Sequence, residues 1–278
     1  MDGVIVINKE EGMTSHDVVA KLRHIFGTRR IGHTGTLDPI ATGVLVVCVE
    51  RATKLVDYLT CEDKIYEVEM KFGEKTDTGD RTGNLIARGK CRIDSSRLDE
   101  VIKSFIGKQK QIPPMYSAIK VKGKKLYEYA RKGIKVEREP RDIEIFSIEN
   151  VVLKGSYLSF KIHCSKGTYI RTVCEDIADK FATVGTMTKL NRVRAGMFDI
   201  SDAVKVDDAC EDKLIKLDKL FDNEIIIKNG LYKLINGMPL YFNIPDGMYR
   251  LYTDNYVTKK FIGLGKIKDK YLYRVIIL

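Results

Sequence analysis

The sequence predicts an α+β protein with two domains, a large mixed-sheet domain over residues 1–223 and a small β-rich domain over 224–278. Helix and strand patterns are mixed without the regular alternation of a doubly wound sheet, which favours the α+β class. After Asn223 the pattern changes to short strands, glycine turns and many tyrosines. With 278 residues, of which 44% are hydrophobic and 31% charged, the chain can bury a substantial core, and its composition excludes a disordered protein.

The first sixty residues predict two buried strands and two helices around a polar loop. Residues 4–7 are a continuous apolar run, which is typical of a strand inside a core. Ser15 is expected to cap a helix that ends near Phe26. The elements that follow are a polar, glycine-rich loop over 28–43, a strand buried on both faces over 44–49 and a short helix over 52–59.

The clearest alternation in the sequence predicts a half-buried strand over residues 65–72. One face of this strand carries Tyr66, Val68, Met70 and Phe72. The later elements are expected to be a helix with a capping box at Ser96 and Asp99 that Gly107 ends, a helix over 125–132, paired strands over 143–153 and 157–164, a helix from Thr168 to about Phe181, two short strands over 186–200 and a helix over 207–220.

Two basic segments stand out from a chain whose formal net charge is +10. Residues 107–141 contain eleven Lys or Arg and three Glu, and residues 224–278 contain nine Lys or Arg and four Asp or Glu. Two such segments favour a polyanionic partner such as a nucleic acid. Lysine-rich solvated faces are also common in proteins without such a partner, so the charge by itself leaves both explanations open.

Cysteine and histidine spacing argues against both a disulfide framework and a metal site. The six cysteines, at 48, 61, 91, 164, 174 and 210, form no Cys-x-x-Cys pair, and the four histidines are scattered. We expect reduced thiols that mostly fill the core. The longest apolar run has six residues, and the start Met1-Asp2-Gly3 is acidic, so we expect neither a membrane span nor a signal peptide and place the protein in the cytoplasm.

The loop over residues 32–43 is the first candidate for chemistry. It places one carboxylate, Asp38, and one imidazole, His33, between two buried elements, and such loops often carry function. The loop lacks the Gly-Lys-Ser/Thr of a P-loop and the strand-to-helix setting of a Rossmann fingerprint. A tight connector in which Asp38 only starts an Asp-Pro turn explains the same residues.

Two further segments place charge or aromatic rings beside turns. Arg171 lies in the first turn of a predicted helix, where the helix dipole does not favour a cation. An acidic partner across a cleft is one explanation, and an ordinary surface arginine is the other. His163 and Cys164 are adjacent on a strand and point to opposite faces, so we do not expect them to pair. The segment 111–127 interleaves tyrosine with lysine, which is typical of RNA binding, although Tyr127 fits a helix core equally well.

The segment Gly-His-Thr-Gly-Thr-Leu-Asp-Pro-Ile-Ala-Thr-Gly at 32–43 resembles the catalytic motif of the TruB family of tRNA pseudouridine-55 synthases. The likeness runs in order from about residue 3 to 220, and the tail from Glu224 resembles a PUA-like RNA-binding domain. Glu10 departs from the family, which usually has a proline after the lysine. The other matching segments are Asn8-Lys9, Gly12-Met13-Thr14-Ser15, Lys64-Ile65-Tyr66, Thr76-Asp77-Thr78, Pro114-Met115-Tyr116-Ser117-Ala118, Gly123-Lys124-Lys125-Leu126-Tyr127-Glu128-Tyr129-Ala130 and Ser165-Lys166-Gly167-Thr168-Tyr169-Ile170-Arg171.

This resemblance implies roles for seven residues. Asp38 would be the essential carboxylate that acts on a flipped nucleotide, Tyr66 would stack on the uracil, and Arg171 would pair with Asp38. The supporting roles fall to His33, which would help evict the base, to Tyr169 and Leu190, which would line the pocket, and to Lys9, which would support the catalytic motif. A nearby arginine favours the ionised carboxylate, as the chemistry requires. The alternation over 65–72 allows the stacking role of Tyr66, and core packing explains that residue equally well.

The resemblance also implies the reaction and the partners. The expected enzyme isomerises uridine 55 in the T loop of tRNA by base flipping, needs no metal or cofactor, and works as a monomer without a membrane or protein partner. Two other classes of protein are a noncatalytic RNA-binding or tRNA-folding protein on the same scaffold and an RNA methyltransferase. The set Asp38, Tyr66 and Arg171 argues against a pure binder, and the lack of a glycine-rich cofactor loop after a strand argues against a methyltransferase.

Overall fold

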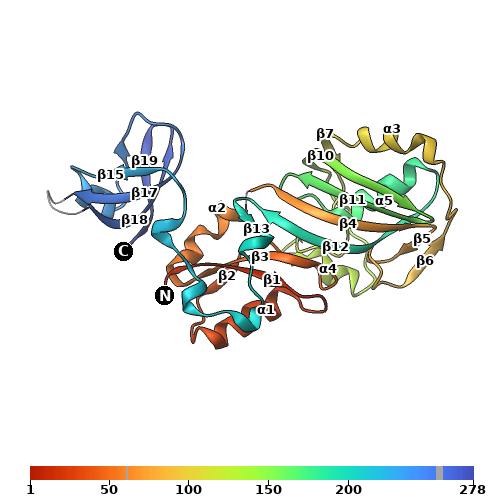
Figure 1. Cartoon of the computed structure of the whole chain (residues 1–278), viewed down its shortest axis with the longest axis horizontal. Coiled ribbons are helices and arrows are strands. Elements are labelled where there is room, and N and C mark those ends of the chain that lie inside the picture. Colours follow the sequence, from red (N-terminus) through yellow and green to blue (C-terminus); the bar gives the residue numbers. More distant parts are fainter. Residues whose placement is uncertain (61, 255–258) are drawn as a thin grey trace.

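Two β-sheets of different size organise the molecule (Figure 1). The computed structural model describes residues 1–60, 62–254 and 259–278. Within these residues a ten-stranded sheet is built from the chain up to Lys216, and a five-stranded sheet is built from residues 224–277. Helices and 3-10 turns are interspersed between the strands, so the predicted α+β class is confirmed.

The large sheet is mixed, because β3 and β12 run parallel while the other neighbouring strands run antiparallel. Two short strands pair outside the main path, β2 (Ile31–His33) with β3 and β13 (Phe198–Asp199) with β12. The order across the sheet is β14 (Ile215–Lys216), β1 (Gly3–Lys9), β3 (Thr42–Val49), β12 (Gly185–Ala195), β4 (Lys64–Phe72), β11 (Tyr157–Cys164), β10 (Arg141–Lys154) and β7 (Gly107–Gln111). The predicted strand pair on either side of residues 154–156 is confirmed in β10 and β11.

Helices pack against one face of the large sheet, which we call the inner face, and α1 (Ser15–Ile25) and α5 (Ile170–Lys180) are the longest of them. These two helices share an apolar core with β4, whose predicted alternation is confirmed because Tyr66, Val68, Met70 and Phe72 are all buried. Strand β3 is buried on both faces, as its apolar run predicts. The shorter helices are α2 (Val56–Thr60), α3 (Leu98–Lys103), α4 (Leu126–Ala130) and α6 (Leu231–Ile235).

The caps of α1 and α3 differ from the sequence prediction. Thr14 rather than Ser15 caps α1, and its hydroxyl accepts a hydrogen bond from a backbone N–H in the first turn. The side chain of Ser15 is thereby released for another contact, described below. Helix α3 follows a 3-10 turn that Asp94 caps, so the predicted capping box of Ser96 and Asp99 is wrong. In both cases a suitable side chain one or two positions earlier takes the cap.

The later part of the large domain contains three further corrections. The hydroxyl of Thr168 donates to the carbonyl of Ser165, so Thr168 shapes the turn and does not cap α5. Gly107 does not end a helix, because α3 ends at Lys103 with Ser104 as its C-cap and Gly107 begins β7 at the edge of the sheet. The predicted helix over 207–220 is wrong, since this segment forms 3-10 turns and β14. Its apolar residues pack into the clusters on both faces of β1, with Leu214 in one and Leu217 in the other. A single continuous helix would lie on one face only.

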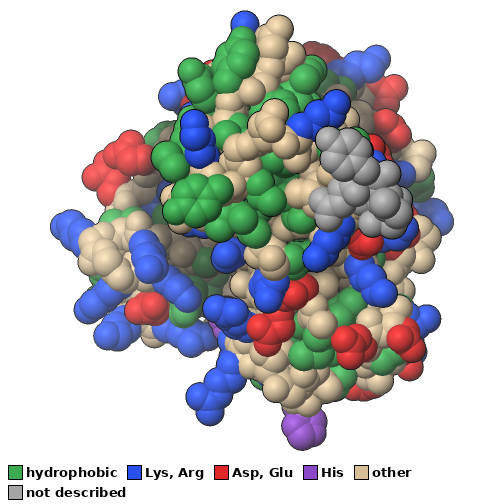
Figure 2. All heavy atoms as spheres, turned by 90° about the vertical axis from the view of Figure 1, so that its left-hand side faces the viewer, with side chains coloured by type: hydrophobic (Ala, Val, Ile, Leu, Met, Phe, Trp, Pro, Cys, Tyr) green, Lys and Arg blue, Asp and Glu red, His purple; other side chains and the backbone are tan. Residues whose placement is uncertain are grey.

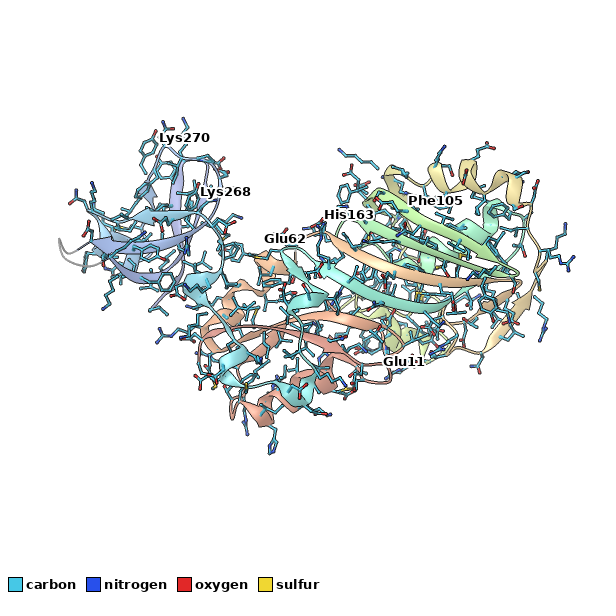
Figure 3. All side chains as sticks on the ribbon, viewed as in Figure 1. Glu11, Glu62, Phe105, His163, Lys268 and Lys270 are labelled. Carbon is cyan, nitrogen blue, oxygen red and sulfur yellow. The ribbon has the colours of Figure 1, made fainter. Side chains whose placement is uncertain are left out.

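The second sheet lies at one end of the molecule and has the order β15 (Glu224–Ile226), β17 (Gly247–Asp254), β18 (Lys259–Lys268), β19 (Tyr271–Ile277) and β16 (Leu240–Tyr241). Lys and Arg side chains are spread among hydrophobic ones on this end (Figure 2), and Lys268 and Lys270 project from it (Figure 3). Leu264 and Ile276 pack into one apolar cluster with Val4. The domain boundary near Asn223 stays a prediction.

Minor elements complete the description. The strands β5 (Glu74–Thr76) and β6 (Leu85–Arg88) form one two-stranded ribbon, and β8 (Lys120–Val121) and β9 (Lys124–Lys125) form another. Cys48, Cys164 and Cys174 are buried free thiols, whereas Cys91 and Cys210 are exposed. The remaining cysteine, at position 61, lies outside the described residues. Within the described parts of the chain, no helix has the length and apolar character needed to cross a membrane.

Candidate active site

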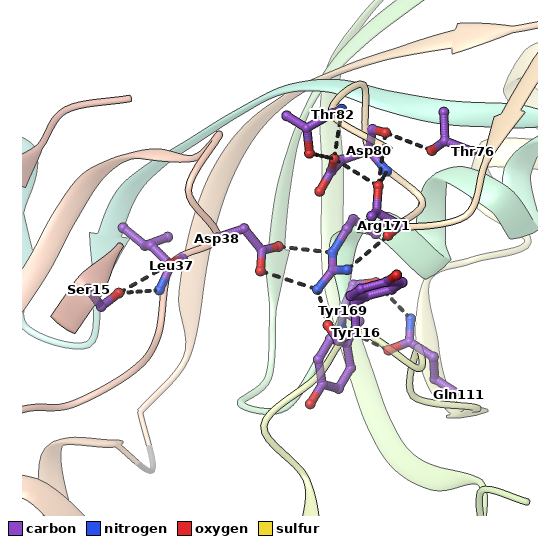
Figure 4. A network of polar contacts seen from close by, with 11 residues as sticks. Ser15, Leu37, Asp38, Thr76, Asp80, Thr82, Gln111, Tyr116, Tyr169 and Arg171 are labelled. Atoms are coloured by element: carbon purple, nitrogen blue, oxygen red, sulfur yellow. Dashed lines mark hydrogen bonds and ion pairs between the residues drawn. The ribbon is translucent and has the colours of Figure 1, made fainter. Parts of the chain in front are cut away.

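Asp38 and Arg171 meet at the inner face of the large sheet, although 133 positions separate them in the sequence (Figure 4). The Nε of Arg171 lies 2.9 Å from Oδ2 of Asp38, and its Nη2 lies 3.2 Å from Oδ1. Two parallel contacts of this kind fix the relative orientation of the two planar groups. Asp38 comes from the loop between β2 and β3, and Arg171 comes from the first turn of α5. The arginine therefore has the acidic partner that its place in the helix suggested.

Backbone carbonyls from two other segments hold Arg171. Its Nη1 donates to the carbonyl of Thr78 at 2.9 Å, and its Nη2 donates to the carbonyl of Tyr116 at 2.8 Å. The side chain of Arg171 is 6% exposed, whereas that of Asp38 is 30% exposed. The arginine thus lies behind the carboxylate, and the carboxylate keeps one side open to an incoming molecule.

The residues on both sides of Asp38 are bonded to the start of α1 and the end of β1. The backbone N–H of Leu37 donates to Oγ of Ser15 at 2.9 Å, which is the contact that the corrected cap of α1 makes available. The carbonyl of Pro39 accepts hydrogen bonds from the N–H of Gly12 at 2.8 Å and from Nζ of Lys9 at 3.4 Å. Lys9 is 1% exposed, and its Nζ also donates to the carbonyls of Met13 at 2.7 Å and Glu10 at 2.9 Å, so that it joins the end of β1 to the Asp38 loop.

A second layer of polar side chains shapes the segments that hold Arg171. The carboxylate of Asp80 accepts hydrogen bonds from the N–H of Thr82 at 2.9 Å and the hydroxyl of Thr78 at 3.0 Å, which fixes the turn that presents the Thr78 carbonyl. The side-chain amide of Gln111 accepts from the N–H of Tyr169 at 2.8 Å and donates to its carbonyl at 3.1 Å. Both contacts set the start of α5 and hence the position of Arg171.

Tyr66 and Leu190 lie on the inner face of the neighbouring strands β4 and β12. They are 8% and 7% exposed, and Leu190 stands opposite Val68 in the strand pairing. Arg192 stands opposite Tyr66. Burial raises the pKa of the Tyr66 phenol, so this ring is neutral at pH 7. A neutral aromatic ring in an apolar setting is suited to stacking against a base.

His33 and Tyr169 lie at the edges of this group. The ring centroid of His33 lies 5.8 Å from that of His16, and within the described residues no hydrogen bond or ion pair joins His33 to Asp38 or Arg171. Burial lowers the pKa of His33 to about 4, which makes the imidazole neutral at pH 7. Burial also raises the pKa of the Tyr169 phenol. Both rings are therefore uncharged.

Burial and ion pairing act in opposite directions on the charged groups. Burial raises the pKa of the Asp38 carboxyl above its ordinary value, and the Arg171 guanidinium opposes that shift. Burial lowers the pKa of Lys9 to about 8, and the negative charge of Asp38 opposes that shift. The Asp38 carboxyl is therefore more basic than that of an exposed aspartate, and Arg171 limits that shift. Within the described residues, no group of three or more His, Cys, Asp or Glu is arranged to hold a metal ion.

Sequence reasoning did not single out Arg192 or Asp80, and it included Gln111 only as the first residue of the RNA-binding candidate segment 111–127. Asp80 lies in a turn with several threonines, which is a recognisable pattern for a carboxylate that accepts local hydrogen bonds. Gln111 is the last residue of a strand that was not predicted, so its direction was not available. Arg192 follows Leu190 by two positions on a strand, and this spacing is the signal by which sequence reasoning could have placed both side chains on one face.

Comparison with known proteins bears directly on these residues. Residues 23–170, which include Asp38 and Tyr66, match the model of the TruB family pseudouridylate synthase N-terminal domain. The chain belongs to the TruB family. It is 43% identical to the tRNA pseudouridine synthase B of Clostridium kluyveri, with 97% of this chain and 96% of the relative covered. It is 45% identical to the tRNA pseudouridine synthase B of Caldicellulosiruptor saccharolyticus, with 86% and 84% covered.

Solved structures support the fold of this TruB family member. A chain in the crystal structure of a Cbf5–Nop10–Gar1 complex is 25% identical and superposes with a TM-score of 0.70, covering 99% of this chain and 84% of that one. A chain from an H/ACA RNP bound to a substrate RNA containing 2′-deoxyuridine has a TM-score of 0.65 and 23% identity, with 95% and 77% covered. Both superpositions include the second sheet, so the predicted fold of a large mixed-sheet domain with a β-rich C-terminal part is confirmed.

Proposed function

We propose that the protein isomerises uridine 55 in the T loop of tRNA to pseudouridine and that Asp38 is its essential carboxylate. The observation that carries the proposal is the pair of Asp38 and Arg171, in which a partly open acid is backed by a buried arginine beside a buried tyrosine. Relatives that match nearly the full chain are tRNA pseudouridine synthases.

The reaction needs a closed pocket with one ionised carboxylate. The C1′–N1 bond of the uridine breaks, the uracil turns, and a C1′–C5 bond forms while the hydrogen leaves C5 and N1 gains one. Asp38 acts on the flipped nucleotide, and Arg171 keeps the carboxylate ionised and oriented. Tyr66 stacks on the uracil, and Leu190 and Tyr169 line the pocket. A base that is detached in this way is kept from escaping by apolar walls on either side.

The remaining site residues bring the nucleotide to Asp38. Extrusion of a base costs a few kcal/mol, which contacts to the opened loop must offset. His33 is neutral at pH 7 and lies at the end of β2. There it helps to evict the base and to hold the opened stem-loop. Lys9 holds the catalytic loop from behind through the Pro39 carbonyl.

The partner is the T stem-loop of tRNA, bound by a monomer in the cytoplasm without a metal or cofactor. The basic segments at 107–141 and 224–278 supply the cations that neutralise phosphates in this proposal. One of them also reaches the site, because Tyr116 contributes a carbonyl to Arg171. A protein that only bound or refolded tRNA would have no use for a buried arginine that orients an open carboxylate.

The decisive experiment is nucleoside analysis of an unmodified tRNA transcript after incubation with the purified protein and a chelator. RNA labelled with tritium at C5 of uracil should release one label for each uridine that is converted. A transcript without uridine at position 55 is the matched control. Folded protein that binds the transcript and yields no pseudouridine would contradict the proposal, and so would a requirement for added metal once the tRNA is folded.

A further inference from the structure

Arg192 is a buried cation that the proposed chemistry does not use. It is 2% exposed, and among the described residues no carboxylate lies within ion-pair distance of its guanidinium. A charge that is buried without a counter-ion destabilises a fold unless its hydrogen bonds are satisfied. The partners that satisfy Arg192 are therefore informative about why the residue is present.

The contacts of Arg192 reach both ends of the loop that carries Asp38. At the start of the loop, its Nη2 donates to the carbonyl of Gly35 at 3.0 Å. After the end of the loop, its Nε donates to the carbonyl of Val44 at 2.7 Å. One planar guanidinium thus joins the backbone before Asp38 to the backbone after it.

The backbone of Arg192 touches the same loop a third time. Arg192 pairs with Gly43 in the parallel contact of β12 with β3. A Cβ at Gly43 would lie 2.3 Å from the carbonyl oxygen of Arg192, and Gly43 has a φ of +97°, so only glycine allows the two backbones to approach this closely. The Cβ position of Gly35 lies 3.5 Å from Nη1 of Arg192. The loop is closed around this arginine.

Arg192 also connects the loop to the stacking residue. It stands opposite Tyr66 on the inner face, and directly opposed residues of antiparallel strands have Cβ atoms about 5 Å apart. We infer that Arg192 is a positioning residue for the isomerisation: it ties both ends of the Asp38 loop to the strand beside Tyr66 and so fixes the carboxylate relative to the ring. This inference rests on the proposed function.

Arg194 provides the matched control, because it lies two positions further along β12. A register shift between Arg192 and Arg194 turns the second arginine to the opposite face, where it contacts Asp63 at 2.7 Å. Both arginines therefore belong to β12, but only Arg192 contacts the Asp38 loop. The same substitutions at the two positions compare an arginine that holds the loop with one that does not. Lysine keeps the charge but cannot reach both carbonyls, and glutamine removes the charge.

For Arg192→Lys and Arg192→Gln we expect kcat at saturating tRNA to fall by about tenfold to hundredfold, since charged hydrogen bonds are lost. The dissociation constant for tRNA should stay within about threefold. Arg194→Lys and Arg194→Gln should keep kcat within about twofold. Should the glutamine variant fail to fold, Arg192→Lys decides the question. A value of kcat within twofold of wild type for Arg192→Lys would overturn the inference, as would an equal loss in Arg194→Lys.

Amide hydrogen exchange tests the same inference without the reaction. We expect the peptide that spans residues 33–43 to exchange at least about tenfold faster in Arg192→Lys than in wild type or Arg194→Lys, while peptides of α5 stay unchanged. Unaltered exchange in that peptide would overturn the positioning role even in an active enzyme. If the wild-type protein formed no pseudouridine, the proposed function would fail, and the exchange experiment would still decide whether Arg192 holds the loop.

Discussion

Two acid–arginine clusters on the same large sheet differ in how far their arginine is buried. On the inner face Asp38 pairs with Arg171. On the opposite face Asp63 contacts Arg194 and His163. His163 belongs to β11 and stands opposite Ile65, near the start of β4 (Figure 3). The two acids are almost equally exposed, at 30% and 29%. The arginines are not, because Arg171 is 6% exposed and Arg194 is 35% exposed.

The difference lies in what holds each arginine. Arg171 also donates to carbonyls of Thr78 and Tyr116, from two segments remote in sequence, whereas the described contacts of Arg194 are confined to Asp63 and His163. An exposed ion pair contributes about 0–1 kcal/mol to stability and leaves both partners free to move. An arginine fixed by three segments instead holds its acid in one orientation. The buried arginine, held by backbone from two further segments, distinguishes the proposed active site from the Asp63 cluster.

Substitution of the two acids should give the largest contrast. Asp38→Asn keeps the shape of the side chain and removes its charge, so we expect turnover to become undetectable while tRNA affinity stays within about tenfold, or roughly 1.4 kcal/mol. Asp63→Asn should keep near-normal turnover, because its cluster lies on the other face. Tritium release and filter binding measure the two quantities. Wild-type rates from Asp38→Asn would end the assignment of this carboxylate.

Substitution of the two arginines should give the next largest contrast. Arg171→Lys keeps the charge but loses the fork that contacts Asp38 twice and two carbonyls besides, so kcat should fall by about tenfold to hundredfold with little change in affinity. Arg194→Lys should stay within about twofold in the same assay. Equal effects at the two positions would show that the burial of the arginine does not distinguish the clusters.

The two buried lysines extend the comparison to pH. Lys9 donates to the Pro39 carbonyl in the Asp38 loop, and Lys64 donates to the carbonyl of Thr60 beside the Asp63 cluster. Burial lowers the pKa of each lysine to about 8. Because Lys9 loses its proton as pH rises through about 8, kcat should decline on the basic side and reach about a tenth of its plateau at pH 9.

The matched variants separate the two lysines. Arginine stays charged in this range, so Lys9→Arg should remove the basic decline in the kcat profile, while Lys64→Arg should leave it in place. A stopped assay at closely spaced pH values from 6 to 9.5, with tRNA saturating at each, measures the profile. An unchanged profile in Lys9→Arg would exclude Lys9 as the titrating group.

The smallest effect per residue is expected from exposed lysines remote from both clusters. Lys268 and Lys270 are exposed on the second sheet (Figure 3). Each phosphate contact that is lost should lower the slope of log affinity against log salt by about 0.7 to 0.9. Lys268→Gln and Lys270→Gln should therefore weaken tRNA binding and flatten its salt dependence, and kcat at saturation should stay within about twofold. An unchanged salt slope would remove these lysines from the tRNA-binding surface.

Substitution is a better test of the second sheet than its removal. Leu264 and Ile276 share an apolar cluster with Val4 and Val46, so deletion of residues 224–278 would expose the side of β1 and β3 that faces them. Loss of activity in such a truncated chain would report on folding as much as on binding. Neutral substitutions at exposed lysines leave that cluster intact.

The sequence by itself determined the elements whose pattern is local. The apolar run of β3 and the alternation of β4 predict buried strands because period and hydrophobicity are properties of neighbouring residues. Asp38, Tyr66 and Arg171 were found because their segments match a family motif in order. The cap of α1 was misplaced by one residue, since Thr14 and Ser15 are both good caps and only the contact of Ser15 with Leu37 decides between them.

The tertiary structure alone decided which charges are buried together. Strict alternation along β12 would put Arg192 and Arg194 on one face, and the register shift against β4 separates them. The carbonyls that hold Arg171 belong to backbone, which every residue carries, so no side-chain pattern in the sequence identifies them. Residues far apart in the chain meet only when the strands are paired. The chemistry of the site therefore depends on pairing that local sequence does not encode.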